Sequence, residues 1–155
     1  MKVYLLQHGE ALAKDVDPGR PLSPQGEGDV QRVAAFLEQA GVSVDRVLHS
    51  GKMRAHQTAD ILAAAVLSRG KAEAVEGIAP NDPVDEFSRR LHDLDGDTAI
   101  VGHLPFMARM ASYLVTGDAV ADIVAFQPGG GVCLEQDETG HWRILWMLRP
   151  ELLQQ

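Results

Sequence analysis

The sequence predicts an α/β fold: a three-layer sandwich with a mostly parallel central sheet, helices on both of its faces and a C-terminal antiparallel hairpin. Short apolar stretches alternate four times with patterns of helical period, which is typical of parallel sheets covered by helices. Two further apolar stretches then flank a turn at residues 137–140, as in a hairpin. A length of 155 residues with 45% hydrophobic content suits one cored domain, so we expect a single domain over residues 1–155.

The first predicted strand is followed by a long loop. Valine, tyrosine and leucine crowd together over residues 2–6, which indicates a buried strand. Prolines and a glycine prevent regular structure over residues 10–23, and a 14-residue loop of this kind is usually functional or mobile. Ser23 is a suitable N-cap and Pro24 a suitable first helical residue, and apolar residues then recur at helical spacing until Gly41. We therefore expect a helix from Pro24 to just before Gly41.

Two more strand and helix units are expected in the middle of the chain. Residues 46–49 form a short strand pattern, and Ser50 is expected to cap the helix that follows. Residues 71–75 indicate a weaker third strand. Apolar residues at helical spacing then predict a helix between Pro83 and Gly96.

The last strand and helix unit leads into the hairpin. Residues 98–101 indicate a buried strand, and the helix after it is expected to end at Gly117. Residues 131–148 form the predicted hairpin. Trp142 and Trp146 are four residues apart, so we expect both on one face of the last strand, packed into the core.

Composition excludes several classes of protein. A net charge of −8 disfavours nucleic-acid binding. The longest apolar run, residues 61–67, is too short to cross a bilayer, and the run before Gln7 is too short for a secretory signal. The single cysteine, Cys133, lies in an apolar stretch and is expected to be a buried thiol in a reducing compartment. We therefore expect a soluble cytoplasmic protein, monomeric by preference, that binds neither nucleic acid nor membrane.

Basic and imidazole groups are predicted to gather at one edge of the sheet. His8 and His103 each come directly after a predicted parallel strand, and the carboxyl ends of parallel strands are where ligands bind in such folds. Arg20 lies in the long loop and Arg54 in the first turn of a helix, so both would be carried toward the same edge. Two imidazoles and two guanidiniums beside a helix N-terminus are suited to binding phosphate, so the sequence predicts a phosphate-binding site at this edge.

Four segments carry a family resemblance, at residues 3–11, 20–26, 47–59 and 100–105. In this order they contain Gln-His-Gly-Glu, Arg-Pro-Leu-Ser, His-Ser-Gly-Lys-Met-Arg and Gly-His-Leu-Pro. In these segments the chain resembles the histidine phosphatase superfamily, which has the phosphoglycerate mutase-like fold, and within it the small SixA-type phosphohistidine phosphatases. One such motif alone is common, whereas four in the same order with compatible spacing are a specific signal.

The resemblance implies a phosphohistidine phosphatase that uses neither a metal nor another cofactor. It implies that His8 is the nucleophile and becomes phosphorylated, and that His103, Arg20 and Arg54 bind the transferring phosphoryl group. The substrate would be a phosphohistidine-containing signalling or carrier protein, with a phosphotransfer or phosphocarrier domain. Because a nucleophilic imidazole must be neutral, activity is expected to fall below a pH of roughly 6 to 6.5.

Neighbouring residues are expected to line the substrate site, namely Gln7, Gly9, Ser50 and Gly102, although Ser50 is interpreted first as a helix cap. Gln7 stands where the superfamily usually has arginine, so the site lacks one full charge and one bidentate fork. If that arginine acted as a typical oxyanion donor, its absence would cost about 10² to 10³ in rate. A phosphoramidate P–N bond, whose leaving group departs easily, would tolerate this loss best.

The general acid and the substrate class stay open. Glu10 is a possible proton donor, although a loop-stabilising role is the simpler interpretation, and Asp82 matches no clear motif. One alternative function is a small-metabolite phosphomonoesterase, which would need an acid; another is a catalytically weak phosphate-binding module. A further alternative is a hydrolytic metal centre that uses His8, Glu10 and His103.

Overall fold

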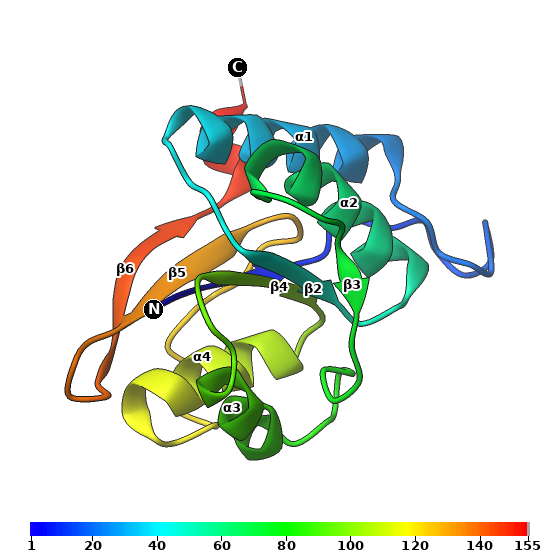
Figure 1. The fold of residues 1–155 in the computed structure, drawn as a ribbon. Coiled ribbons are helices and arrows are strands. Elements are labelled where there is room, and N and C mark those ends of the chain that lie inside the picture. The colour runs from blue at the N-terminus through cyan, green and yellow to red at the C-terminus, as the bar shows by residue number, and fades with distance from the viewer. Residues whose placement is uncertain (155) are drawn as a thin grey trace.

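The computed structural model describes residues 1–154 and confirms the predicted α/β sandwich (Figure 1). Its strands are β1 (Lys2–Gln7), β2 (Arg46–His49), β3 (Glu73–Ala74), β4 (Thr98–Gly102), β5 (Gly131–Gln136) and β6 (Trp142–Leu148). They form a six-stranded sheet in the order β3-β2-β4-β1-β5-β6. The first four strands pair in parallel, and the β5–β6 hairpin joins β1 in antiparallel pairing, as predicted.

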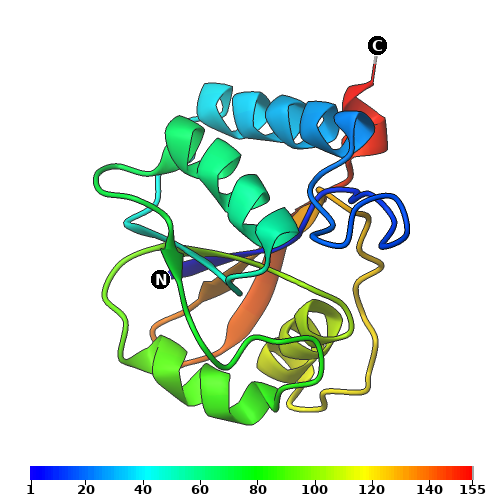
Figure 2. The ribbon, with the colours of Figure 1, turned by 90° about the vertical axis from the view of Figure 1, so that its right-hand side faces the viewer.

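The helices cover both faces of the sheet. They are α1 (Pro24–Gln39), α2 (Met53–Val66), α3 (Val84–His92), α4 (Phe106–Thr116) and the short 3-10 helix η1 (Pro150–Leu153). Figures 1 and 2 show α1 and α2 on one side of the sheet and α3 and α4 on the other. Within residues 1–154, no helix has both the length and the apolarity needed to cross a membrane.

The central strand β1 contributes buried residues to both hydrophobic cores, one on each face of the sheet. Val3 and Leu5 belong to the core that contains the apolar residues of α3 and α4, whereas Tyr4 and Leu6 belong to the core beneath α1 and α2. A strand that is covered on both faces has no solvent-facing side. This explains why β1 has a continuous run of buried residues and not an alternating pattern.

The predicted N-terminal and C-terminal caps are confirmed at two helices. Ser23 caps α1, since its hydroxyl oxygen accepts a hydrogen bond from the Gly26 amide at 3.0 Å. Gly117 ends α4 with a φ of +79°, a left-handed conformation that favours glycine. The weak third strand is shorter than predicted, because only Glu73–Ala74 pairs with β2, and the helix expected up to Gly96 ends at His92.

The prediction that Ser50 caps the next helix is wrong. α2 begins at Met53, and its N-cap position is occupied by Lys52. Gly51 turns the chain between β2 and α2 with a φ of +90°. The Ser50 hydroxyl lies 2.6 Å from Nε2 of the His103 imidazole, and toward the helix it accepts only a long hydrogen bond, at 3.5 Å, from the amide of Lys52.

The two tryptophans lie on opposite faces of the sheet, which also corrects the prediction. Cys133 pairs with Trp146, but its neighbour Leu134 pairs with Ile144, so β6 carries one extra residue there. Such a bulge shifts the side-chain alternation by one position. Trp142 is therefore buried with the residues of α3 and α4, and Trp146 packs against the core beneath α1 and α2.

Candidate active site

His8 and His103 lie side by side at the carboxyl edge of the sheet. β1 and β4 are parallel neighbours, and their register pairs Gln7 with Gly102. Each histidine is the next residue along its strand, so both side chains leave the sheet at the same edge. The ring centroids are 4.9 Å apart, with the ring planes tilted by 53°. The structure therefore brings the two predicted imidazoles together.

The His8 ring is held in the tautomer that a nucleophile needs. Its Nδ1 lies 2.7 Å from the carbonyl oxygen of Gly9. A carbonyl oxygen can only accept, so Nδ1 carries the proton and Nε2 keeps its lone pair. Burial, with smaller contributions from the charges of Arg54 and Arg20, lowers the pKa of His8 below its ordinary value of 6.5. The imidazole is therefore neutral at pH 7.

His103 is more deeply buried than His8. Its Nε2 lies 2.6 Å from the Ser50 hydroxyl oxygen. Burial, followed by the charges of His8, Arg54, Lys52 and Arg20, lowers the pKa of His103 to about 3. This ring also enters the site as a neutral group. Lys52, which the sequence analysis did not single out, adds positive potential at the ring because it occupies the N-cap position of α2.

Arg20 and Arg54 supply the positive charge of the site. Arg20 lies in the long loop with a left-handed φ of +49°, and its Nε donates to the carbonyl oxygen of Leu12 at 3.1 Å. Burial, with a contribution from the charge of Arg20, lowers the pKa of Arg54, so the two cations are close enough to repel each other. Neither forms an ion pair with any carboxylate within residues 1–154. Two uncompensated guanidiniums beside two neutral imidazoles make a preorganised anion site.

Two residues of α2 that the sequence analysis did not assign to the site hold its parts together. The Thr58 hydroxyl oxygen accepts from the Gly9 amide at 3.0 Å and donates to the Arg54 carbonyl at 2.8 Å. Gln57 accepts from the amide of Leu22, at the end of the long loop, at 2.8 Å. Thr58 is four residues after Arg54, one helical turn away. This spacing was the only feature of the sequence that could have placed Thr58 near the site.

The expected lining residues differ in what surrounds them. Gln7 is buried, and its Oε1 has no hydrogen-bond partner within residues 1–154. Gly9 and Gly102 are packed tightly, since an added Cβ would lie 2.8 Å from Val30 at Gly9 and 3.0 Å from Met107 at Gly102. Close packing therefore accounts for both glycines, and a direct role in substrate binding stays a prediction for them.

Neither the Glu10 carboxylate nor the Asp82 carboxylate forms a hydrogen bond with His8 or His103 within residues 1–154. Glu10 is exposed, and its main-chain oxygen accepts from the amide of Ser23 at 2.9 Å. Asp82 accepts from the amide of Ala79 at 2.8 Å, which closes a turn. Across residues 1–154, no three His, Cys, Asp or Glu side chains converge as a metal site requires, so His8, Glu10 and His103 do not form the alternative metal centre.

Comparison with known proteins identifies relatives of this chain. The family model described as "Histidine phosphatase superfamily (branch 1)" matches residues 3–76. An uncharacterised protein of Picosynechococcus is 34% identical over 126 residues, which covers 76% of this chain and 74% of that protein. The phosphohistidine phosphatase SixA of Escherichia coli is 26% identical over 155 residues, covering 97% of this chain and 94% of SixA.

The fold is similar to that of a solved structure whose chain is named SixA, like the E. coli relative. A structure of the protein histidine phosphatase SixA complexed with tungstate superposes with a TM-score of 0.88. The alignment covers 99% of this chain and 100% of that chain, at 24% sequence identity. At this identity the similarity shows the shared fold.

Proposed function

Since the chain belongs to the histidine phosphatase superfamily and is a phosphatase, we propose that it hydrolyses phosphohistidine on a signalling or carrier protein without a metal. The observation that carries this proposal is the hydrogen bond from His8 Nδ1 to the Gly9 carbonyl, at 2.7 Å. It leaves Nε2 free as a neutral nucleophile beside two arginines that have no carboxylate partner.

The proposed reaction has two phosphoryl transfers. In the first, His8 Nε2 forms a bond to phosphorus while the P–N bond of the substrate breaks. The substrate imidazole leaves as a neutral ring when its other nitrogen already carries a proton. In the second, water attacks the phosphohistidine at His8; its oxygen bonds to phosphorus, its proton goes to the phosphate, and Nε2 is released. Arg20, Arg54 and His103 would stabilise the equatorial oxygens in both steps.

The position of the carboxylates supports a P–N substrate. An alkoxide leaving group must be protonated as it departs, whereas phosphohistidine can carry the required proton on its own ring. Asp82 is held in a turn, and the exposed Glu10 carboxylate forms no hydrogen bond with either histidine within residues 1–154, so the structure offers no evident acid. Gln7 retains an amide in place of the usual arginine, and an easily displaced leaving group compensates best for that missing charge.

The rim of the site supports a macromolecular substrate. Met53 and Leu104 expose 49% and 41% of their surface. Met53 follows the N-cap Lys52, and Leu104 follows His103, so two exposed apolar residues and a cation are next in sequence to residues of the anion site. Apolar residues beside a charged pocket suit the face of an acidic protein. The name of the E. coli relative, a phosphohistidine phosphatase, agrees with this assignment.

Trapping of the phosphoenzyme tests the proposal. The protein is incubated with ³²P-phosphohistidine on a phosphotransfer domain, in the presence of EDTA, and then denatured in alkali. We expect acid-labile label on His8 and release of phosphate in the wild type and in the control His141→Ala, which changes an exposed histidine of the hairpin. His8→Ala should lose both.

Other outcomes would assign a different function. Label that persists in His8→Ala would remove His8 from the nucleophile role. Hydrolysis that EDTA abolishes would indicate a metal-dependent reaction. Faster hydrolysis of glycerol or sugar phosphates than of phosphohistidine would indicate a small-metabolite phosphomonoesterase. Tight binding of phosphate with no turnover of any substrate would indicate a binding module.

A further inference from the structure

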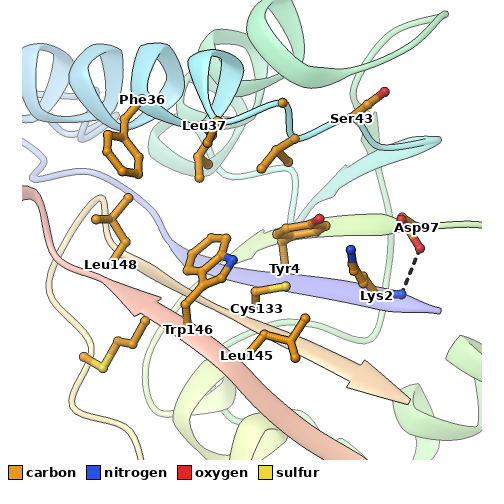
Figure 3. Close-up of a pocket in the computed structure, with 14 residues that line it drawn as sticks. Lys2, Tyr4, Phe36, Leu37, Ser43, Asp97, Cys133, Leu145, Trp146 and Leu148 are labelled. Atoms are coloured by element: carbon orange, nitrogen blue, oxygen red, sulfur yellow. Dashed lines mark hydrogen bonds between the residues drawn. The ribbon is translucent and has the colours of Figure 1, made fainter. Parts of the chain in front are cut away.

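An apolar cavity lies at the end of the sheet opposite to the candidate active site (Figure 3). Its volume is about 640 Å³, within the range of small-molecule sites. It is lined by Lys2, the first residue of β1, and by Asp97, which precedes β4. Because His8 follows the other end of β1, the two sites are separated by about 20 Å of strand. The cavity is therefore distinct from the phosphate site.

The cavity exists because α1 does not cover the outermost strand of the sheet. β6 is the edge strand, and its pocket side faces α1 across an open space. The walls are apolar and partly exposed, at 46% for Phe36, 44% for Leu145 and 39% for Met147. In Figure 3, Phe36 extends from α1 toward Leu148 and Trp146 of β6. Two aromatic rings and several aliphatic side chains can thus hold an apolar ligand body.

Two hydrogen-bond donors, the Lys2 ammonium and the Trp146 indole N–H, face this space without an acceptor among residues 1–154. The Tyr4 hydroxyl, which is beside the Cys133 thiol, also faces it. Figure 3 shows Lys2 and Tyr4 rising from β1 into the cavity, with the indole nitrogen on the side of Trp146 that faces Tyr4. Burial raises the pKa of Tyr4, so its hydroxyl remains a donor at neutral pH. A ligand that supplies acceptors would satisfy these groups.

The charged residues at one end of the cavity favour one kind of ligand head group. Lys2 forms no ion pair within residues 1–154, so its cation is available to a ligand anion. Asp97 lies at the same end of the cavity, where its Oδ1 accepts from the Lys2 amide at 2.8 Å. This carboxylate would repel a phosphate dianion more strongly than a single negative charge. The cavity therefore suits a monoanion.

We propose that this cavity binds a small amphipathic monocarboxylate, with its apolar body between Phe36 and Trp146 and its carboxylate on the Lys2 ammonium. The charge complementarity between the unpaired Lys2 and the carboxylate determines the orientation. The aromatic and aliphatic walls supply most of the binding free energy. The proposal is independent of the reaction at His8.

Three probes that share one phenylalkyl body test the proposal by isothermal titration calorimetry: 4-phenylbutyrate, 4-phenyl-1-butanol and 4-phenylbutylamine. We expect saturable binding of the acid, about tenfold weaker binding of the alcohol and the weakest binding of the amine. Lys2→Met keeps the apolar stem and should lower the affinity for the acid about tenfold, whereas Lys2→Arg should retain it. Trp146 fluorescence should change on binding of the acid.

Matched variants separate this cavity from the phosphate site. Arg54→Ala removes a cation of the candidate active site and should leave the affinity for 4-phenylbutyrate unchanged. Equal binding of the acid and the alcohol, stronger binding of the amine, or loss of binding in Arg54→Ala in place of Lys2→Met would overturn the proposal. A dimer in sedimentation analysis that binds none of the probes would assign the cavity to a second copy of the chain.

Discussion

The Ser50 hydroxyl oxygen lies 2.6 Å from Nε2 of His103, across 53 residues of sequence. The contact joins the residue after β2 to the residue after β4. Because β2 and β4 are parallel neighbours, their carboxyl ends lie together, and a short side chain on one reaches the imidazole on the other. A hydrogen bond to one ring nitrogen orients the whole ring. We infer that Ser50 fixes the orientation of the His103 ring at this edge of the sheet.

Ser50→Ala should therefore reduce turnover without unfolding the protein. Loss of one hydrogen bond corresponds to about 1 kcal/mol, or about a fivefold lower kcat. Steady-state kinetics on a phosphohistidine substrate measure this change, with Ser43→Ala, a distant exposed serine, as the control. A wild-type kcat in Ser50→Ala would show that the contact does not position His103.

The acid limit of activity, the pH below which kcat/KM decreases, should be lower than the value of roughly 6 to 6.5 expected from the sequence. Burial, Arg54 and Arg20 lower the pKa of His8 below 6.5, so its neutral, nucleophilic form persists to a lower pH. After correction for acid hydrolysis of the substrate, kcat/KM should stay level as the pH falls past 6.5 and should decrease only when the pH reaches the lowered pKa of His8. Arg20→Gln removes a nearby cation, so its acid limit should move up toward 6.5. An unmoved limit would contradict this electrostatic explanation.

Stability should fall as the pH drops below 6.5. The pKa of His103 is about 3 in the folded protein and 6.5 for an ordinary histidine, so between these values only the unfolded chain binds the proton. This difference destabilises the fold by about 2 kcal/mol between pH 6.5 and 5. Urea unfolding at pH 7 and pH 5 measures it. His103→Gln should reduce the difference, and the exposed His141→Gln should not.

Two glycines of α1 provide a matched pair of stability tests. A Cβ at Gly26 would lie 2.0 Å from the main-chain oxygen of Glu10, whereas a Cβ at Gly28 would meet only the flexible end of Arg32 at 3.4 Å. Gly26→Ala should destabilise the protein by about 2 kcal/mol and displace the loop that carries Arg20, with loss of activity. Gly28→Ala should stabilise it by about 0.5 kcal/mol. Urea unfolding measures the change in the free energy of unfolding for both variants.

The apolar rim should matter for a protein substrate more than for a small one. Replacing both Met53 and Leu104 by alanine should raise KM for a phosphohistidine protein about tenfold. The rate with free phosphoramidate should change far less, because that substrate does not reach the rim. Ile144→Ala, an exposed apolar residue on β6, is the control. Equal effects on both substrates would argue against docking at this rim.

The sheet and the histidine pair could be predicted from sequence because local patterns determine them. The strands β1 and β4 end directly before His8 and His103, and parallel strands end at a common edge. The place of Arg54 at the site could be predicted as well, because it lies in the first turn of a predicted helix that begins at the same edge of the sheet. These inferences need only hydrophobic periodicity and the topology of an α/β fold.

Other features depend on contacts that no local pattern records. The Ser50 contact with His103 requires the turn at Gly51, whereas a serine after a strand resembles an ordinary cap. Thr58 meets the Gly9 amide across 49 residues of sequence. The bulge in β6 changes which face Trp146 occupies without any glycine or proline to indicate it. In each case tertiary packing decided between local alternatives.

The burial of Cys133 has a practical consequence. This cysteine is 1% exposed, and burial raises the pKa of its thiol to about 11, so almost no thiolate exists at neutral pH. Maleimide reagents should leave it unmodified in the folded protein. A cysteine introduced at an exposed site, such as His141→Cys in the hairpin turn, would then accept a spectroscopic label at one defined position without removal of the native residue.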